Sequence, residues 1–412
     1  MEFSTAVMYI ALFSALYLEV FLLITFLENA LGPQKKRPRM RRIPDNLPSV
    51  AIVVPCFNQS ETLAATLRSL LALDYPKEKL EIIAVDDGST DDTYEIMRKF
   101  EADPRVRIFR KENGGKHSAM NLALENTGAK IIGCLDADSF VAKDALLHLM
   151  PHFDDPRVAA VTPSIKVFEP RGVLQLVQKA EYGLSIFIRK TFSLLDAIFI
   201  TPGPFSFFRK SAIHAVGPWR HGHSTEDLEM GIRLQKSHFK IQNEPNAHVY
   251  TTAPATWRGL FRQRVRWTYG FLRNSADYRS MFFNPEYGNL GLLVLPFSLF
   301  SLISAVYMFA LVIWNVGVFA AEQMAKFQTI GLAAAEPRFD PFYINATTVL
   351  GVTIALITLT LVLIVIGKRL ASDRATPSAD MALYLLLYGF LAPVWLSAAT
   401  WKALTDGNVR WR

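Results

Sequence analysis

Three carboxylates surround a predicted helix start in the middle of the chain. The stretch HSTEDLEMGIRLQKSHF, residues 223–239, places Glu226, Asp227 and Glu229 directly after Ser224 and Thr225. A Ser or Thr at this point caps a helix by accepting a backbone N–H, and acids in the first turn suit the positive end of the helix dipole. The same arrangement fixes a carboxylate where it can remove a proton from a substrate hydroxyl. The stretch therefore predicts either an ordinary cap or a catalytic base.

A second pair of acids, Asp136 and Asp138, closes the run AKIIGCLDADS. Strand side chains alternate, so both carboxylates lie on one side of an extended chain and repel each other. A divalent cation, Mg²⁺ or Mn²⁺, would relieve this repulsion, with nucleotide phosphates completing its coordination. Asp-x-Asp is also common in chains without such a site, so the pair alone does not define one.

Two further stretches suit a nucleotide. VDDGSTDD carries Asp86 and Asp87 where a strand turns into a helix, and a carboxylate there can accept from a base N–H or a ribose hydroxyl. ENGGKHSAMN sets a glycine pair before Lys116, whose ammonium and neighbouring backbone N–H groups suit phosphate oxygens. The alternative for the first stretch is a plain βα turn, and for the second a flexible turn with a solvated lysine.

An amphipathic stretch follows, WRGLFRQRVRWTYGFLRN, residues 257–274. Its arginines and aromatics at helical spacing predict a helix that lies on a membrane surface. The same residue types suit a sugar diphosphate, because guanidinium groups bind phosphate oxygens and an indole stacks on the apolar face of a sugar ring. Both uses are compatible in one helix.

The elements that would position these residues alternate between strand and helix from residue 49 to about residue 252. Residues 50–57, 80–89 and 129–139 read as buried strands, and the second and third run out into the acids described above. This alternation predicts an α/β domain with a mostly parallel sheet and helices on both faces. Ligands bind at the carboxyl ends of strands in such sheets, which is where the acids lie.

Both ends of the 412-residue chain are apolar enough for a membrane. Residues 7–27 and three later segments, 290–320, 347–366 and 381–399, have the length and composition of membrane spans. Basic residues at 34–42 follow the first span and predict that the catalytic domain lies in the cytosol and the C-terminus outside. The protein is expected in the plasma (inner) membrane. The expected regions are a span at 1–30, the catalytic domain at 31–253, interface helices at 254–287 and three spans within 288–412.

The net charge of +7 therefore reflects the membrane rather than nucleic acid, since no basic stripe interleaved with aromatics suggests a nucleic-acid groove. The only two cysteines, Cys56 and Cys134, sit in apolar strand-like runs. They predict buried thiols in a reducing compartment.

The order Asp, Asp-x-Asp, Thr-Glu-Asp and Gln-x-x-Arg-Trp, flanked by spans, resembles the processive membrane glycosyltransferases of family 2. That family includes hyaluronan, chitin, cellulose and poly-N-acetylglucosamine synthases. The resemblance covers nearly the whole chain and implies a GT-A-type domain beside a transmembrane bundle. It also implies an inverting transferase that extends a polysaccharide from a UDP-sugar, expected to be UDP-N-acetylglucosamine, and exports it through its own channel.

The resemblance also assigns roles to residues. Asp227 becomes the general base, with Glu226 supporting it. The donor-binding residues would be Asp86, Asp87, Lys116, Asp136 and Arg266. The metal, Mg²⁺ or Mn²⁺, would be held by Asp138 with Asp136. The acceptor, a growing glycan, would contact Gln263 and Trp267, together with Gly203 and Pro204 in the segment PGPFSFFRKSAI.

Two other functions fit the same motifs. A non-processive transferase would add one sugar to a lipid or lipid-linked acceptor. A catalytically inactive relative would serve as a membrane-anchored sugar-binding scaffold, although Asp138, Asp227 and Arg266 are all present. Product length separates the first two functions, and transfer of any donor sugar excludes the third.

Overall fold

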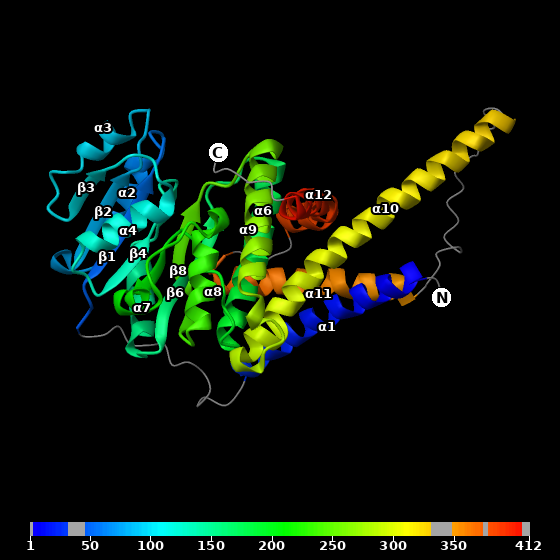
Figure 1. Cartoon of the computed structure of the whole chain (residues 1–412), viewed down its shortest axis with the longest axis horizontal. Helices are drawn as coiled ribbons and strands as arrows, with labels where there is room; N and C mark the ends of the chain where they lie inside the picture. Colours follow the sequence, from blue (N-terminus) through cyan, green and yellow to red (C-terminus); the bar gives the residue numbers. More distant parts are fainter. Residues whose placement is uncertain (1–2, 32–45, 331–347, 374–377, 406–412) are drawn as a thin grey trace.

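One eight-stranded sheet forms the centre of the soluble part (Figure 1). The computed structural model describes residues 3–31, 46–330, 348–373 and 378–405, so the basic run at 34–42 lies outside the described residues. The strands run in the order β3-β2-β1-β4-β7-β6-β8-β5. Their bounds are β1 Val50–Cys56, β2 Leu80–Asp86, β3 Val106–Arg110, β4 Ile131–Cys134, β5 Ser139–Val141, β6 Val158–Val167, β7 Ser206–Arg209 and β8 Lys240–Thr251.

The sheet is mostly parallel, as the strand–helix alternation predicted. β3, β2, β1 and β4 are all parallel to one another, and β6 is parallel to β8. β7 and β5 are the exceptions, because each pairs antiparallel with its neighbours. All seven residues of β1 are buried or nearly so, as expected for a central strand covered on both faces.

Helices cover both faces of this sheet. On one face, apolar residues of β1 and β2 pack against α2 Leu63–Leu71, α3 Thr93–Arg98 and α5 Ala145–Leu149. On the other face, they pack against α4 Lys116–Asn126, α7 Lys210–Val216 and α8 Glu226–Lys236. Cys56 and Cys134 are buried free thiols within these two cores, as predicted. Short 3₁₀ turns connect several elements, among them Lys77–Lys79, Met150–Asp154 and Gly222–Ser224.

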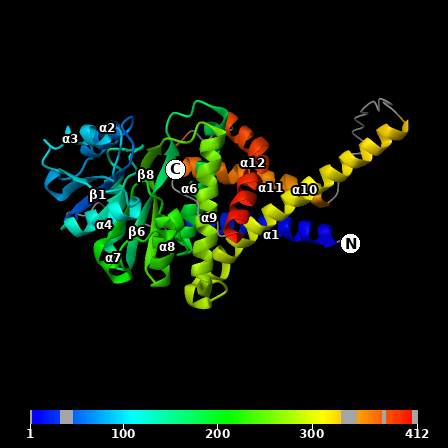
Figure 2. The ribbon, with the colours of Figure 1, turned by 45° about the horizontal axis from the view of Figure 1, so that its top comes forward.

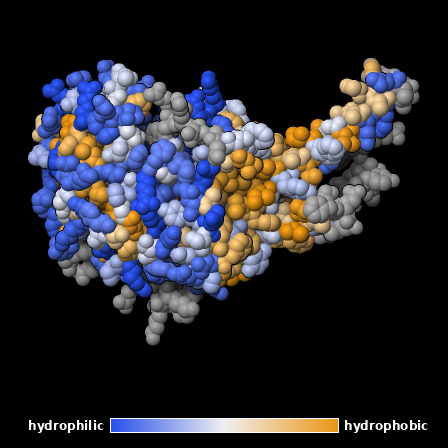
Figure 3. All heavy atoms as spheres, viewed as in Figure 1, coloured by the Kyte–Doolittle hydropathy of each residue, from blue (hydrophilic) through white to orange (hydrophobic). Residues whose placement is uncertain are grey.

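Within the described residues, four helices are long and apolar enough to cross a membrane, one before the sheet domain and three after it. They are α1 Phe3–Leu31, α10 Leu295–Ile330, α11 Thr348–Leu370 and α12 Ala379–Leu404, with a π-helical turn, Leu290–Val294, leading into α10. Figure 3 shows the change from the hydrophilic domain to the hydrophobic surface of these helices. These helices make the chain an integral membrane protein.

Two amphipathic helices lie between the sheet domain and the apolar helices. They are α6 Val173–Leu194 and α9 Trp257–Asp277, and α9 runs across the direction of α1 and α11 in both ribbon views (Figures 1 and 2). α6 packs against α1, α11 and α12 as well as against β6 and β8. The sequence analysis placed α6 inside the catalytic domain, whereas the structure shows that it also forms the support for the membrane helices.

α12 is oriented differently from α1 and α11. Figure 1 shows α12 nearly end-on, while α1 and α11 run lengthwise across the same view. α12 packs mainly on α6 and α9. Its apolar surface therefore covers the amphipathic helices, which bear one of the predicted binding motifs.

Candidate active site

Lys116 lies at the centre of the candidate site. It is the first residue of α4, and its side chain is about one-tenth exposed. Its Nζ lies 2.5 Å from Asp136 Oδ1 and 3.6 Å from Glu226 Oε1, so it joins the end of β4 to the start of α8. Burial alone would lower the pKa of Lys116, but the Asp136 carboxylate, with Glu226 and Asp227, holds that pKa well above its usual range. Three stretches far apart in sequence therefore meet around one ammonium group.

Asp136 and Asp138 lie in the turn between β4 and β5. The sequence predicted one extended strand through both residues, but β4 already ends at Cys134. Asp138 accepts a hydrogen bond from Ser139 Oγ at 3.1 Å. Burial, and then the charge of the neighbouring Asp136, raise the pKa of Asp138 to about 6. Among the described residues, no group of three or more His, Cys, Asp or Glu side chains surrounds one point. Two carboxylates fit Mg²⁺ or Mn²⁺ when substrate phosphates and water supply the other oxygen ligands.

Asp227 lies in the first turn of α8, beside Glu226. Its Oδ1 accepts the backbone N–H of Leu228 at 2.9 Å, and its carbonyl accepts Thr201 Oγ1 at 2.7 Å. Burial and the Glu226 carboxylate raise its pKa to about 6, against the opposing charges of Lys116 and Arg266. A carboxylate with a pKa near neutrality is suited to exchange protons with a substrate.

The predicted helix cap takes a different form from the one expected. α8 begins at Glu226 after Thr225, but Thr225 makes no capping hydrogen bond with its side chain. Thr225 Oγ1 instead donates to the carbonyl of Gly222 at 2.8 Å and accepts from Asn274 Nδ2 of α9 at 3.1 Å. The side chain is therefore used to fix the loop before α8 rather than the helix start.

That loop has a strained backbone. Gly222, His223 and Ser224 have φ values of 53°, 53° and 64°, and two of them are not glycine. α9 holds them: Asn274 Nδ2 donates to the Gly222 carbonyl at 3.0 Å, and Arg266 Nη1 donates to the Ser224 carbonyl at 2.9 Å. The helix that carries the predicted Arg266 thus also positions the catalytic candidate Asp227.

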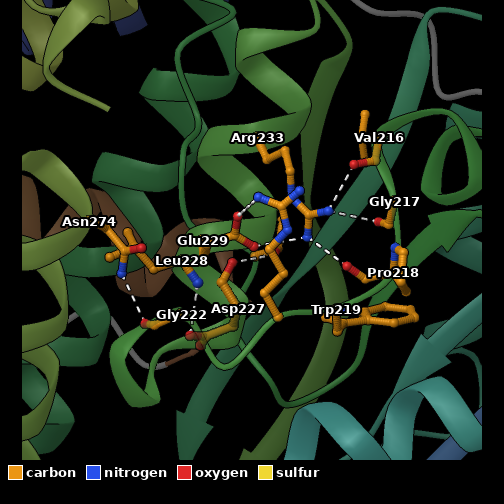
Figure 4. Close-up of polar contacts among 12 residues, drawn as sticks. Val216, Gly217, Pro218, Trp219, Gly222, Asp227, Leu228, Glu229, Arg233 and Asn274 are labelled. Carbon is orange, nitrogen blue, oxygen red and sulfur yellow. Dashed lines mark hydrogen bonds and ion pairs between the residues drawn. The ribbon is translucent and has the colours of Figure 1, made fainter. Parts of the chain in front are cut away.

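Glu229, the third acid of the opening stretch, serves the fold. Its carboxylate accepts from Arg233 Nη2 at 2.9 Å and from Tyr278 Oη at 2.6 Å. Arg233 also donates to the carbonyls of residues 216, 217 and 218 (Figure 4). The Arg233 and Glu229 side chains are about 5% exposed, so this network is buried. The three acids therefore separate into one structural residue and a pair at the site.

Asp86 and Asp87 end β2 and are both buried. Asp86 Oδ1 accepts from the Ser89 backbone N–H at 3.1 Å, and its Oδ2 lies 3.1 Å from Arg110 Nε without a hydrogen bond in the described structure. Asp87 accepts the backbone N–H groups of Gly114 and Gly115 at 3.0 and 2.8 Å. The glycine pair thus donates to a side chain of the chain itself rather than presenting those two N–H groups to a phosphate.

The predicted acceptor residues come from α9 and from the loop before β7. The Trp267 ring is 37% exposed, and the Arg264 guanidinium lies over it, 4.4 Å from the ring centroid. Gln263 Oε1 is buried without a hydrogen-bond partner in the described part of the chain. Gly203 lies against the centre of the site, because a Cβ there would meet Lys116 Nζ at 2.2 Å and Asp136 Oδ2 at 2.9 Å. Pro204 follows it and is half-buried.

Sequence reasoning missed several polar residues around these groups. Arg110, at the end of β3, pairs with Asp86 and stacks over the ring of Tyr94 at 4.6 Å. His117 and His221 form an edge-to-face pair with centroids 5.6 Å apart. Burial, then the neighbouring His221, lowers the pKa of His117. No local motif marks these residues, because each pairing joins elements distant in sequence.

Comparison with known proteins agrees with this fold. A mannosyltransferase structure from Pyrobaculum calidifontis aligns over 98% of each chain, with a TM-score of 0.59 and 18% identity, which shows a shared fold. The sheet, with the apolar helices beside it, thus has a GT-A-type fold.

Sequence comparisons give similarity over about half of the chain. Residues 51–217 match the model of glycosyl transferase family 2. Poly-beta-1,6-N-acetyl-D-glucosamine synthases from Staphylococcus aureus strains are 35% identical over 229 residues, 55% of each chain. The Staphylococcus epidermidis enzyme is 35% identical over 224 residues. The chain therefore matches about half the length of these curated relatives.

Proposed function

We propose that this protein is an inverting membrane glycosyltransferase that extends a polysaccharide from a UDP-sugar, with UDP-N-acetylglucosamine as the donor. The observation that carries the proposal is the position of Lys116, whose ammonium contacts Asp136 and Glu226 together. The choice of sugar follows from the similarity to poly-N-acetylglucosamine synthases.

Asp227 acts as the general base in this proposal. An acceptor hydroxyl attacks the anomeric carbon from the face opposite the nucleotide diphosphate, through a transition state with oxocarbenium character. Asp227 removes the hydroxyl proton as the new bond forms, and Glu226 keeps the pKa of Asp227 raised. One displacement inverts the anomeric centre without a covalent enzyme intermediate.

Cations stabilise the leaving diphosphate, which gains negative charge in this step. Lys116 supplies positive charge beside Asp136, and both Lys116 and Arg266 supply it near Asp227. Mg²⁺ or Mn²⁺ held by Asp136 and Asp138 would add charge neutralisation on the phosphate oxygens when bound. Asp86 and Asp87 lie at the end of β2, where they are suited to bind uridine directly or to hold the residues that do.

The acceptor end lies along α9 and the segment before β7. Trp267 uses one face of its ring against Arg264, which leaves the other face for a sugar. Gln263 supplies an unused buried acceptor, and Gly203 with Pro204 keeps the backbone close to the acidic centre. The membrane helices beside α9 provide the export route, in a plasma (inner) membrane with the catalytic domain in the cytosol.

The test is purified full-length protein with Mg²⁺ or Mn²⁺ and a panel of nucleotide sugars. UDP release and product length are measured together. The proposal predicts UDP release from UDP-N-acetylglucosamine and a glycan of many residues. A single sugar on a lipid would support the non-processive alternative instead, and absence of transfer from every donor would remove the enzymatic assignment.

A further inference from the structure

A second pocket lies where the sheet domain meets the end of α11, and it shares no residue with the candidate active site. Its volume is about 130 Å³. It is formed by the end of β6, one face of α6, Tyr250 of β8 and the residues that close α11. Its polar lining consists of Lys166, Lys179, Tyr182, Tyr250, Lys368 and Asp373. We name it the α6–α11 pocket.

The α6–α11 pocket carries more positive charge than its carboxylates balance. Lys166 Nζ donates to the Ala371 carbonyl and lies 3.2 Å from Asp373 Oδ1. Lys368 Nζ lies 2.6 Å from Asp380 Oδ2, so this pair is satisfied at the pocket wall. Lys179 has no carboxylate within ion-pair distance among the described residues. Three ammonium groups thus face two carboxylates, and the unmatched one belongs to α6.

The pocket lies at the end of a candidate membrane span, where lipid headgroups are expected. Lys368 stands at the end of α11, whose candidate span is Val349–Leu370. α6 crosses α11 closely here, because a Cβ on Gly367 would meet the Gly183 carbonyl oxygen at 1.9 Å. The remaining lining is apolar and includes Ile165 and Ile186. An apolar wall beside the unmatched ammonium of Lys179, at the end of a candidate span, suits the phosphate of a lipid with acyl chains.

We propose that the α6–α11 pocket binds the phosphate of an anionic phospholipid, with Lys179 as its principal cation. Free inorganic phosphate shares the same chemistry, but it would not use the apolar wall or the position at the end of the span. A bound lipid would tie α6, the support of the catalytic domain, to the bilayer.

The test uses full-length protein in nanodiscs of phosphatidylcholine with increasing phosphatidylglycerol. Retained lipids are counted by native mass spectrometry after release. Wild-type protein is expected to retain one phosphatidylglycerol. Lys179→Met is expected to bind this lipid about fivefold more weakly, which is the effect of one interfacial lysine. Lys402→Met is the matched control, since Lys402 is exposed near the end of α12 and lies outside the pocket. It should retain the lipid.

Three outcomes would overturn the proposal. They are equal losses in Lys179→Met and Lys402→Met, equal retention of phosphatidylcholine and phosphatidylglycerol, and displacement of the lipid by millimolar inorganic phosphate. A thermal melt of each variant confirms folding, so a loss of lipid is not mistaken for unfolding. Because the readout is lipid retention, its failure is distinct from failure of glycosyl transfer.

Discussion

At the scale of residues, the three acids in the first turn of α8 have different surroundings. The pKa of Asp227 is raised against the opposing charges of Lys116 and Arg266, whereas Glu229 is paired with Arg233 and Tyr278. Their place in the helix does not separate them, and in the sequence only the resemblance to a known family singled out Asp227. Their different surroundings come from residues distant in sequence. Tyr278 lies 49 residues from Glu229, and Lys116 lies more than 100 residues from Glu226.

The raised pKa of Asp227 predicts a pH profile. A general base must be ionised, so transfer should be constant above the pKa and fall tenfold per pH unit below about pH 6. An ordinary aspartate would lose activity about two units lower. The measurement is the initial rate of UDP release at saturating donor from pH 4.5 to 8.5, with a melt at each pH. A plateau that persists to pH 4.5 would contradict the assignment.

Glu229 should matter for stability and not for chemistry. Glu229→Gln removes a buried charge partner of Arg233, which should cost about 3 kcal/mol of unfolding free energy. Transfer per folded molecule should stay close to that of the wild type. Asp277→Asn is the control, because its pair with His223 is more exposed and should cost less than about 1 kcal/mol. The assignment fails if Glu229→Gln melts normally yet loses transfer.

At the scale of elements, α9 joins chemistry to membrane anchoring. Its polar side chains hold the strained loop at residues 222–224, while Arg264 pairs with Glu181 of α6 at 2.6 Å. Glu181 in turn accepts from Tyr388 of α12 at 3.2 Å. One helix therefore links the loop that carries the proposed base, Asp227, to two membrane-associated helices.

Gly270 tests this role of α9. A Cβ at Gly270 would lie 2.2 Å from Thr225 Oγ1, so Gly270→Ala should push the loop before α8 away. We expect a loss of about 1–3 kcal/mol in stability and a larger loss of transfer than of donor binding. Gly128→Ala is the matched control, because nothing lies within 4 Å of the added Cβ. Unchanged transfer in folded Gly270→Ala would show that α9 does not position Asp227.

Local patterns predicted the elements better than their pairings. Apolar runs marked β1, β2 and β4, helical spacing marked α9, and length with apolar composition marked the four apolar helices. The same patterns did not reveal that α6 supports the membrane helices, because its mixed face fits either a domain helix or an interface helix. Nor did they reveal that Asp87 would bind Gly114 and Gly115, since that contact forms only when two loops fold together.

At the scale of the whole molecule, the helices imply an orientation. α1 begins and α10 ends far from the sheet domain (Figures 1 and 2). The 36 residues of α10 extend about 54 Å, more than the ~30 Å hydrocarbon core, so its far end should project beyond the bilayer. Within the bundle, Thr360 Oγ1 of α11 donates to Glu19 Oε1 of α1 at 2.8 Å, which pairs the acid inside the protein.

This orientation is testable with single cysteines, because both natural thiols are buried. Glu322→Cys, near the far end of α10, should react with a membrane-impermeant maleimide on intact cells. Glu101→Cys, exposed on the sheet domain, should react only after permeabilisation. The reverse pattern would place the catalytic domain outside the cell and contradict the use of a cytosolic nucleotide sugar.

The central claim is that the carboxylate of Asp227 takes the acceptor proton at a site shared with Lys116 and the Asp136–Asp138 pair. The most direct measurement compares Asp227→Asn with wild type, using calorimetry for UDP-sugar binding and single-turnover assays for transfer. The account predicts binding within about twofold and transfer slower by at least about a hundredfold. Transfer at a rate near that of the wild type, in a variant that binds donor and folds normally, would contradict it.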